Sequence, residues 1–250
     1  MTQLIKKDYD TTNFIQDLKE LGLSLTAEQI NEFLRYYELL VEWNEKINLT
    51  AITEYADVLK KHFIDSLSLA KAIDLSKNKK IIDIGTGAGF PGLALKIAFP
   101  ELEVTLLDSL NKRVLFLNQV IEELDLKGVV AIHGRAEDFA GKADHRECYD
   151  LSVSRAVANL TTLSEYCLPF VKLGGYFISY KSEKTEEELS QAKSAISLLG
   201  GNIEKQVEFT LPSSDIYRNL VMIKKAQTTP KKYPRKAGLP AKEPLYRMSK

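Results

Sequence analysis

The chain has 250 residues, a hydrophobic fraction of 44% and a formal net charge of zero. This length suits one large α/β domain, alone or with a small appendage, and the apolar content excludes a disordered chain. No apolar run reaches the roughly 18–20 residues of a membrane span, and the polar residues 1–10 lack a signal peptide's apolar stretch. Cys148 and Cys167 form neither a disulfide framework nor a metal motif, so we expect a cytoplasmic protein without a bound metal.

Charge is distributed unevenly along the chain. Residues 224–250 contain nine basic residues and one acidic residue, a net charge of +8, which leaves −8 for the rest. Such asymmetry predicts a polyanionic partner for the C-terminal tail. A solvated basic tail would have the same composition, so charge alone does not decide between the two interpretations.

The first 75 residues have a helical pattern. Thr26 and Gln29 have the spacing of a capping box at the start of a helix. The apolar residues behind it recur at helical spacing: Ile30, Phe33, Leu34, Tyr37, Leu40 and Val41. A second helix over 58–72 places four more apolar residues on one face: Leu59, Phe63, Leu67 and Ala70. We therefore predict a helical N-terminal cap over residues 1–75.

From residue 79 onward, apolar strands alternate with helices. The predicted strands are 80–84, 103–108, 129–133, 149–153, 174–180, 207–211 and 220–224. The predicted helices are 93–98, 112–126, a segment that ends near 167, and 186–199. Repeated βα units indicate a parallel sheet covered by helices on both faces.

The last two predicted strands are joined by a short turn at Pro212 and Ser213, so they must be antiparallel. The sequence thus predicts an α/β, Rossmann-like fold with a seven-stranded, mostly parallel sheet and an antiparallel last strand. Class I methyltransferases have a sheet of this kind, and nucleotide dehydrogenases do not. We expect residues 76–226 to form this domain and residues 227–250 to form the basic tail.

The strongest local motif follows the first predicted strand and opens a helix. Gly85, Gly87 and Gly89 alternate there, which permits a sharp turn and the close approach of a ligand. Phe90 and Pro91 occupy the start of the helix, and proline has no N–H to offer a pyrophosphate. The motif favours a cofactor without a pyrophosphate over a purely structural turn.

Three further positions at strand ends are candidates for cofactor contacts. Asp108, 23 residues after Gly85, is predicted to accept hydrogen bonds from ribose hydroxyls, with a helix N-terminal charge as the alternative. The stretch 133–138, at the end of the third strand, is predicted to contact an adenine ring through a backbone N–H and an acidic side chain, with a helix cap as the alternative. Arg155 is predicted to pair with the cofactor's methionine carboxylate or an RNA phosphate, with a surface salt bridge as the alternative.

If the chain is a methyltransferase, as its predicted sheet suggests, individual residues restrict the atom that it can methylate. Neither cysteine follows a proline, which argues against attack on pyrimidine C5, and Cys167 is interpreted as a core residue. The sequence SRA at 154–156 replaces the Asn-Pro-Pro-aromatic type of motif for exocyclic amines. Ribose 2′-O-methylation requires a lysine near a carboxylate as base. Lys181 follows the fifth predicted strand and could serve, so this reaction stays an alternative.

Guanine N7 carries a free lone pair and no proton, so it needs no general base and only correct positioning. We expect no catalytic residue of that kind. His62 is interpreted as a core or surface residue rather than a base, and Tyr37 and Trp43 as core residues.

Several sequence stretches together resemble one known family, the ribosomal small subunit methyltransferase G family, also called glucose-inhibited division protein B. The matching stretches are WN (43–44), NLTAI (48–52), H and DSL (62, 65–67), DIGTGAGFPG (83–92), LDS and KR (107–109, 112–113), GRAE (134–137), SRAV (154–157) and TPKKYPRK (229–236). They span the chain from about residue 43 to the tail in the family's order.

The resemblance implies a bacterial cytoplasmic enzyme that transfers a methyl group from S-adenosylmethionine to N7 of a guanine in the 530 loop of 16S rRNA. It implies that the cofactor is bound by Gly85, Phe90, Ala136, Glu137 and Arg155, to which the residues themselves add Gly87, Gly89 and Asp108. The partner would be 16S rRNA or the small ribosomal subunit, and we expect a monomer without membrane contact.

The resemblance gives the tail a role in RNA binding. Lys231, Lys232, Arg235 and Lys236 could neutralise phosphates, and Tyr233 could stack on a base. We expect substitution of these basic residues to leave cofactor affinity nearly unchanged. Two other classes share some of these features: an NAD-dependent oxidoreductase and a non-catalytic RNA-binding protein.

Overall fold

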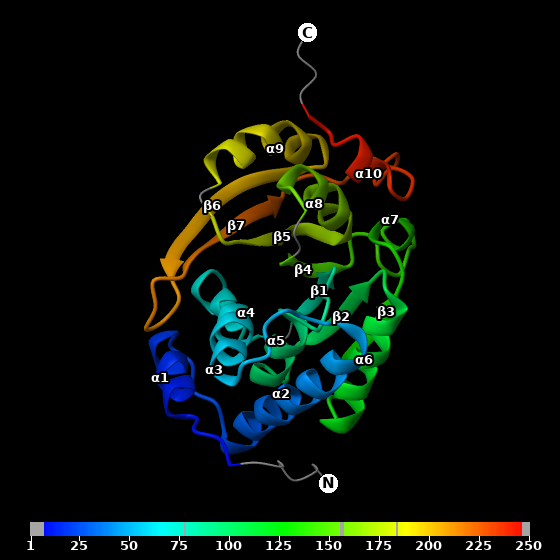
Figure 1. The fold of residues 1–250 in the computed structure, drawn as a ribbon. Helices are drawn as coiled ribbons and strands as arrows, with labels where there is room; N and C mark the ends of the chain where they lie inside the picture. The colour runs from blue at the N-terminus through cyan, green and yellow to red at the C-terminus, as the bar shows by residue number, and fades with distance from the viewer. Residues whose placement is uncertain (1–7, 78, 156–157, 184, 247–250) are drawn as a thin grey trace.

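The computed structural model describes residues 8–77, 79–155, 158–183 and 185–246. Residues 156–157 of the SRAV stretch and residues 247–250 of the predicted tail lie outside these ranges. Seven strands form one sheet in the order β3-β2-β1-β4-β5-β7-β6 (Figure 1). The strands are β1 (Lys80–Ile84), β2 (Glu103–Asp108), β3 (Val129–His133), β4 (Tyr149–Ser154), β5 (Val171–Lys181), β6 (Gly201–Thr210) and β7 (Tyr217–Lys225).

Strands β1 to β5 pair in parallel, whereas β7 runs antiparallel to both β5 and β6. The predicted sheet is therefore confirmed, including its antiparallel last strand. The first three strands have their predicted bounds. Strand β6 begins six residues earlier than predicted because it is an edge strand whose first half is largely exposed and polar, which leaves no apolar run to mark it.

Helices cover both faces of this sheet (Figure 1). They are α1 (Thr12–Glu20), α2 (Ala27–Ile47), α3 (Tyr55–Val58), α4 (Asp65–Leu67), α5 (Gly92–Ala98), α6 (Asn111–Glu123), α7 (Ala136–Phe139), α8 (Leu160–Cys167), α9 (Glu186–Leu198) and α10 (Leu239–Lys242). The N-terminal helices, α5 and α6 share one hydrophobic cluster, and α7 to α9 share a second. Among the described residues, no helix is long and apolar enough to cross a membrane.

The N-terminal helices are joined to the sheet through a helix cap. The predicted capping box on α2 is present: Thr26 Oγ1 accepts from Gln29 N, and Gln29 Oε1 accepts from Thr26 N. The Gln29 side chain also donates to the carbonyls of Ile97 and Ala98 at the end of α5. The predicted helix over 58–72 is a continuous helical run from α3 through a π-helical turn (Leu59–Ile64) and α4 to a 3-10 turn (Ser68–Lys71).

The order of the strands fixes where a ligand can bind. From β1 the chain continues to β2 and β3 on one side, whereas β4 and β5 lie on the other side of β1. A crevice forms at the carboxyl ends of the strands where the order reverses, and ligands of open α/β sheets bind there. The glycine-rich turn between β1 and α5 lies at this point.

Helix α2 also contacts the glycine-rich turn directly. The fully buried Tyr36 hydroxyl donates a hydrogen bond to the carbonyl oxygen of Ala88. Its ring lies 5.4 Å from the ring of Phe90. At Gly89, a Cβ atom would lie 2.5 Å from the Tyr36 hydroxyl. The absence of a side chain at this glycine therefore serves packing against α2.

Replacing Tyr36 with Phe should lower the free energy of unfolding by about 1–2 kcal/mol, because the buried Ala88 carbonyl loses its donor. Urea denaturation measures this loss. Tyr37→Phe is the matched control, since the half-buried Tyr37 hydroxyl donates over 3.3 Å to Thr53, away from the turn. Equal losses in the two variants would show that the Tyr36 contact has no special weight.

Candidate active site

The glycine-rich turn has a conformation that few other residues could adopt. Gly85, Gly87 and Gly89 have φ angles of 70°, 63° and 97°. A Cβ atom on Gly87 would have no neighbour within 4 Å, so this glycine faces open space. Gly87 leaves room for a ligand, whereas Gly89 is enclosed by Tyr36 and Leu93.

Asp108, at the end of β2, holds the turn from the sheet side. Its carboxylate is 2% exposed; Oδ2 accepts from Gly87 N at 2.9 Å and Oδ1 from Leu110 N at 2.9 Å. Arg113, in the first turn of α6, adds an ion pair at 3.3 Å. Both carboxylate oxygens of Asp108 thus accept hydrogen bonds from the protein. This agrees with the alternative prediction, in which Asp108 is a charge at the N-terminus of the following helix. The contact with a ribose stays a prediction.

A cavity of about 310 Å³ adjoins the turn, at the ends of β1, β2 and β3. Gly85, Ala136 and Glu137 line it together with apolar side chains, among them Leu107 and Leu163. An apolar slot with one carboxylate at its edge suits a flat nucleobase. Three predicted cofactor residues from two separate loops are therefore brought together.

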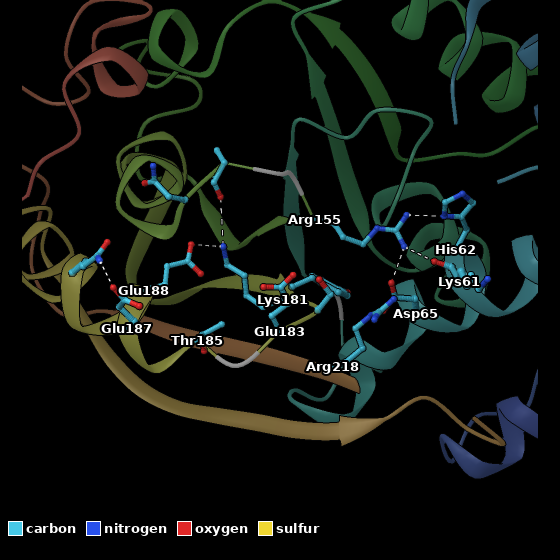
Figure 2. Close-up of a pocket in the computed structure, with 15 residues that line it drawn as sticks. Lys61, His62, Asp65, Arg155, Lys181, Glu183, Thr185, Glu187, Glu188 and Arg218 are labelled. Atoms are coloured by element: carbon cyan, nitrogen blue, oxygen red, sulfur yellow. Dashed lines mark hydrogen bonds and ion pairs between the residues drawn. The ribbon is translucent and has the colours of Figure 1, made fainter. Parts of the chain in front are cut away.

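Arg155 lies at the inner end of a second hollow of about 770 Å³, where Figure 2 shows its guanidinium group pointing towards His62, Lys61 and Asp65. Its Nη1 donates to the Lys61 carbonyl at 3.0 Å and to Asp65 Oδ2 at 3.1 Å. It also lies 5.1 Å above the ring of Phe90. Arg155 therefore forms a salt bridge within the protein, as the alternative expects, although this bridge is half-buried and does not lie on the surface. The contact with a cofactor carboxylate stays a prediction.

His62 and Phe90 form a stacked pair beneath Arg155. The two rings are nearly parallel, with centroids 4.5 Å apart. His62 Nδ1 lies 3.1 Å from Arg155 Nη2, and Nε2 lies 2.9 Å from Thr50 Oγ1. Burial, helped by the positive charge of Arg155, lowers the pKa of His62 to about 3. His62 is therefore neutral near pH 7, and its Nδ1 lone pair accepts from Arg155 and cannot serve as a base.

Asp65 links two arginines, which the sequence did not reveal. Its Oδ2 pairs with Arg155, and its Oδ1 accepts from Arg218 Nε at 2.7 Å. On the opposite wall, Lys181 Nζ pairs with Glu188 Oε1 at 2.7 Å (Figure 2). Asp65, Arg218 and Glu188 come from three distant elements, so neither their spacing nor their periodicity could predict that they meet.

The predicted RNA-binding residues of the tail divide into two groups. Tyr233 is 6% exposed and lies in the hydrophobic cluster of α8, so its ring is not available for stacking on a base in this structure. Arg235 is bound to the buried Glu165 of α8 through several hydrogen bonds. The remaining predicted residues are exposed: Lys231, Lys232 and Lys236.

Comparison with known proteins identifies the family. The rRNA small subunit methyltransferase G family matches residues 29–217. A relative of that name from Lachnoclostridium phytofermentans is 55% identical, over 95% of this chain and 98% of its own. Another, from Clostridium botulinum, is 51% identical, over 90% of this chain and 95% of its own. The chain belongs to the rRNA small subunit methyltransferase G family.

Membership of this family makes the protein an rRNA methyltransferase with S-adenosylmethionine as its cofactor. The alternatives of an NAD-dependent oxidoreductase and of a non-catalytic RNA-binding protein are thereby overturned. The described residues fit this cofactor, because the open side of Gly87, the apolar cavity at Glu137 and the cation of Arg155 can receive a nucleoside that bears an amino acid.

Solved structures support the fold. A chain in a complex of the Trm112 methyltransferase activator with a methyltransferase from Haloferax volcanii superposes with a TM-score of 0.55 and 13% identity, over 75% of this chain and 98% of its own. The YcgJ protein from Bacillus subtilis superposes with a TM-score of 0.51 and 14% identity, over 66% of this chain and all of its own. At these identities the similarity concerns the fold alone.

Asp108→Asn should weaken binding of S-adenosylhomocysteine about tenfold, because the single amide oxygen can no longer accept from both Gly87 and Leu110. Isothermal titration calorimetry measures this affinity. The control is Asp138→Asn, an exposed carboxylate in α7 close to the same cavity. Unchanged affinity in Asp108→Asn would remove this residue from the site.

The lowered pKa of His62 should make stability depend on pH. Unfolded histidine binds a proton below about pH 6.5, whereas folded His62 binds one only near pH 3, so its contribution is complete above pH 6.5 and is lost as the pH falls towards 3. Between pH 7 and pH 5 it amounts to about 2 kcal/mol. Burial raises the pKa of Asp83 to about 6, which gives an opposing slope.

The difference between wild type and His62→Gln isolates the histidine. Urea denaturation at pH 7 and pH 5 should show a smaller loss of unfolding free energy on acidification in His62→Gln. The exposed His133, replaced in the same way, is the control and should behave as wild type. If His62→Gln loses as much stability as wild type, the buried neutral state is contradicted.

Proposed function

We propose that this enzyme methylates N7 of a guanine in the 530 loop of 16S rRNA by direct, in-line attack and without a general base. Guanine N7 presents a lone pair without a proton, so the enzyme has only to place it correctly. The coarser activity, methylation of rRNA, follows from the family.

The observation that carries the proposal is the engagement of the buried titratable groups at the inner end of the second hollow. The His62 lone pair accepts from Arg155, and Asp65 is held between Arg155 and Arg218. Of the described residues at this inner end, His62 and Asp65 are thus both engaged by arginines and are not left to take a proton from a substrate. Methylation of N7 has no such need.

The burial of Cys167 also excludes a covalent route through this thiol. Cys167 is fully buried in α8, and burial raises the pKa of its thiol. A buried, protonated thiol is no nucleophile for a pyrimidine ring. This supports the prediction that Cys167 is a core residue.

In the proposed mechanism, the protein binds and orients the reactants. Gly85 and Gly87 would lie against the middle of the cofactor. Ala136 and Glu137 would line the cavity of its adenine ring, and Arg155 would face its carboxylate. When bound, S-adenosylmethionine supplies a methyl group on a positively charged sulfur. Phe90 fixes the ring of His62 and supports the guanidinium group of Arg155 from below, so that the cation is held in place.

The same proposal assigns parts of the chain to parts of the task. Residues 76–226 form the cofactor-binding domain, residues 1–75 the helical cap, and residues 227–250 the tail. The exposed Lys231, Lys232 and Lys236 would contact phosphates of the RNA. We propose that the enzyme acts as a monomer in the cytoplasm, on 16S rRNA or the small ribosomal subunit.

One observation favours a second candidate, ribose 2′-O-methylation. That reaction uses a lysine near a carboxylate as its base, and Lys181 lies 2.7 Å from Glu188 on the wall of the hollow. The two reactions differ in their need for Lys181, so a substitution there separates them.

The enzyme should place a labelled methyl group on a guanine of small-subunit RNA, and mass-spectrometric mapping of the digested RNA should locate it as N7-methylguanosine in the 530 loop. Lys181→Met should retain this activity within about threefold, since an N7 reaction needs no base. A label on ribose, or abolished transfer in a folded Lys181→Met variant, would contradict the proposal.

A further inference from the structure

The C-terminal tail forms part of the wall of the cofactor cavity. Gly238, just before α10, lines the cavity next to Glu137. Its backbone N–H donates to Glu137 Oε1 at 2.8 Å. Its φ angle of 83° is one that residues with a side chain rarely adopt. A glycine far along the chain thus contacts the residue that we place against the base of the cofactor.

This contact is held in position by a buried ion pair. Arg235 Nη2 lies 2.7 Å from Glu165 Oε2, Arg235 Nε lies 3.0 Å from Oε1, and the Arg235 backbone N–H also donates to Oε1. Glu165 is 1% exposed and projects from α8, whose Leu163 lines the same cavity. Such a bidentate ion pair fixes both the distance and the orientation of the arginine relative to α8.

A second set of bonds fixes the segment that leads to Arg235. Arg146 donates to the carbonyls of Thr229 and Tyr233 at 2.8 and 2.9 Å. The fully buried Lys225 pairs with Glu147 at 3.1 Å and donates to Thr229 Oγ1. In Figure 1 the tail accordingly lies along α7 and α8. The path of this segment is therefore set by contacts within the protein.

We propose that Arg235 and Glu165 are positioning residues for the cofactor, because they hold the Gly238 N–H against Glu137 and so close the base end of the cavity. This inference rests on the proposed placement of the cofactor beside Glu137. It replaces the expectation that the basic residues of the tail leave cofactor affinity unchanged: Arg235 should matter, and the exposed lysines should not.

The test uses the full-length protein and S-adenosylhomocysteine in isothermal titration calorimetry. Arg235→Gln should weaken binding about tenfold, as expected for loss of a charged hydrogen-bonded contact. Lys236→Gln, at the exposed neighbour, should leave binding unchanged. With small-subunit RNA as substrate, Arg235→Gln should raise KM for S-adenosylmethionine while kcat at saturating cofactor stays within about twofold. Unchanged affinity and KM in Arg235→Gln would overturn the inference.

A double variant separates positioning from stability. Arg235→Gln leaves the buried Glu165 charge without its partner, which destabilises the fold. Adding Glu165→Gln removes that charge and should restore the urea midpoint, whereas the affinity for S-adenosylhomocysteine should stay low. Recovery of the affinity together with the stability would show that the pair acts on the fold alone and would overturn the inference.

A third variant tests the placement on which the inference rests. Ser109 is exposed and lines the same cavity, so Ser109→Trp should fill it and abolish binding of S-adenosylhomocysteine without disturbing the core. Normal binding in Ser109→Trp would refute the placement of the cofactor itself. Abolished binding there, together with normal binding in Arg235→Gln, would refute only the role of the tail.

Discussion

The active site depends on the conformation of one turn, which is held from two sides. Three residues with positive φ angles follow β1, and such a turn has no regular secondary structure to stabilise it. Asp108 fixes the backbone N–H of Gly87 from the sheet, and Tyr36 fixes the carbonyl of Ala88 from α2. The N-terminal helices therefore help to fix the shape of the turn, because α2 supplies the donor for the Ala88 carbonyl.

The second principle of the site is that its buried charges compensate one another. Asp65 lies between Arg155 and Arg218, and Glu165 receives Arg235. Taking charges out of water is costly unless each has a well-placed partner. This arrangement engages Asp65 and Glu165 in ion pairs and leaves the cation of Arg155 at the crevice.

Patterns within a few consecutive residues predicted the short strands and the helix start correctly. Strands β1 to β3 are short apolar runs flanked by turns, and the capping box of α2 lies within four residues, so the sequence alone was sufficient for both. The glycine motif likewise indicated the turn. In contrast, β6 is an exposed edge strand, and its polar first half has no pattern that distinguishes it from a loop.

Contacts between distant segments could not be predicted in the same way. The stacking of His62 on Phe90 and the bridge from Asp65 to Arg218 join elements that meet only in the folded chain. For the tail, composition was misleading. Positive charge suggested a single RNA-binding segment, yet Arg235 has an internal partner and Tyr233 is buried in the core, so the exposed members of the predicted set are Lys231, Lys232 and Lys236. The composition of the tail does not show which of its residues are buried, and burial separates Tyr233 and Arg235 from the exposed lysines.

The bond between Gly238 and Glu137 spans 101 positions of the chain. Translation proceeds at about 5–20 residues per second, so roughly 5–20 seconds pass between the synthesis of one partner and that of the other. A growing polypeptide can build its central sheet during that time, but the cavity beside Glu137 gains the wall formed by Gly238 only after residue 238 has been synthesised. Until then the cavity is open on this side.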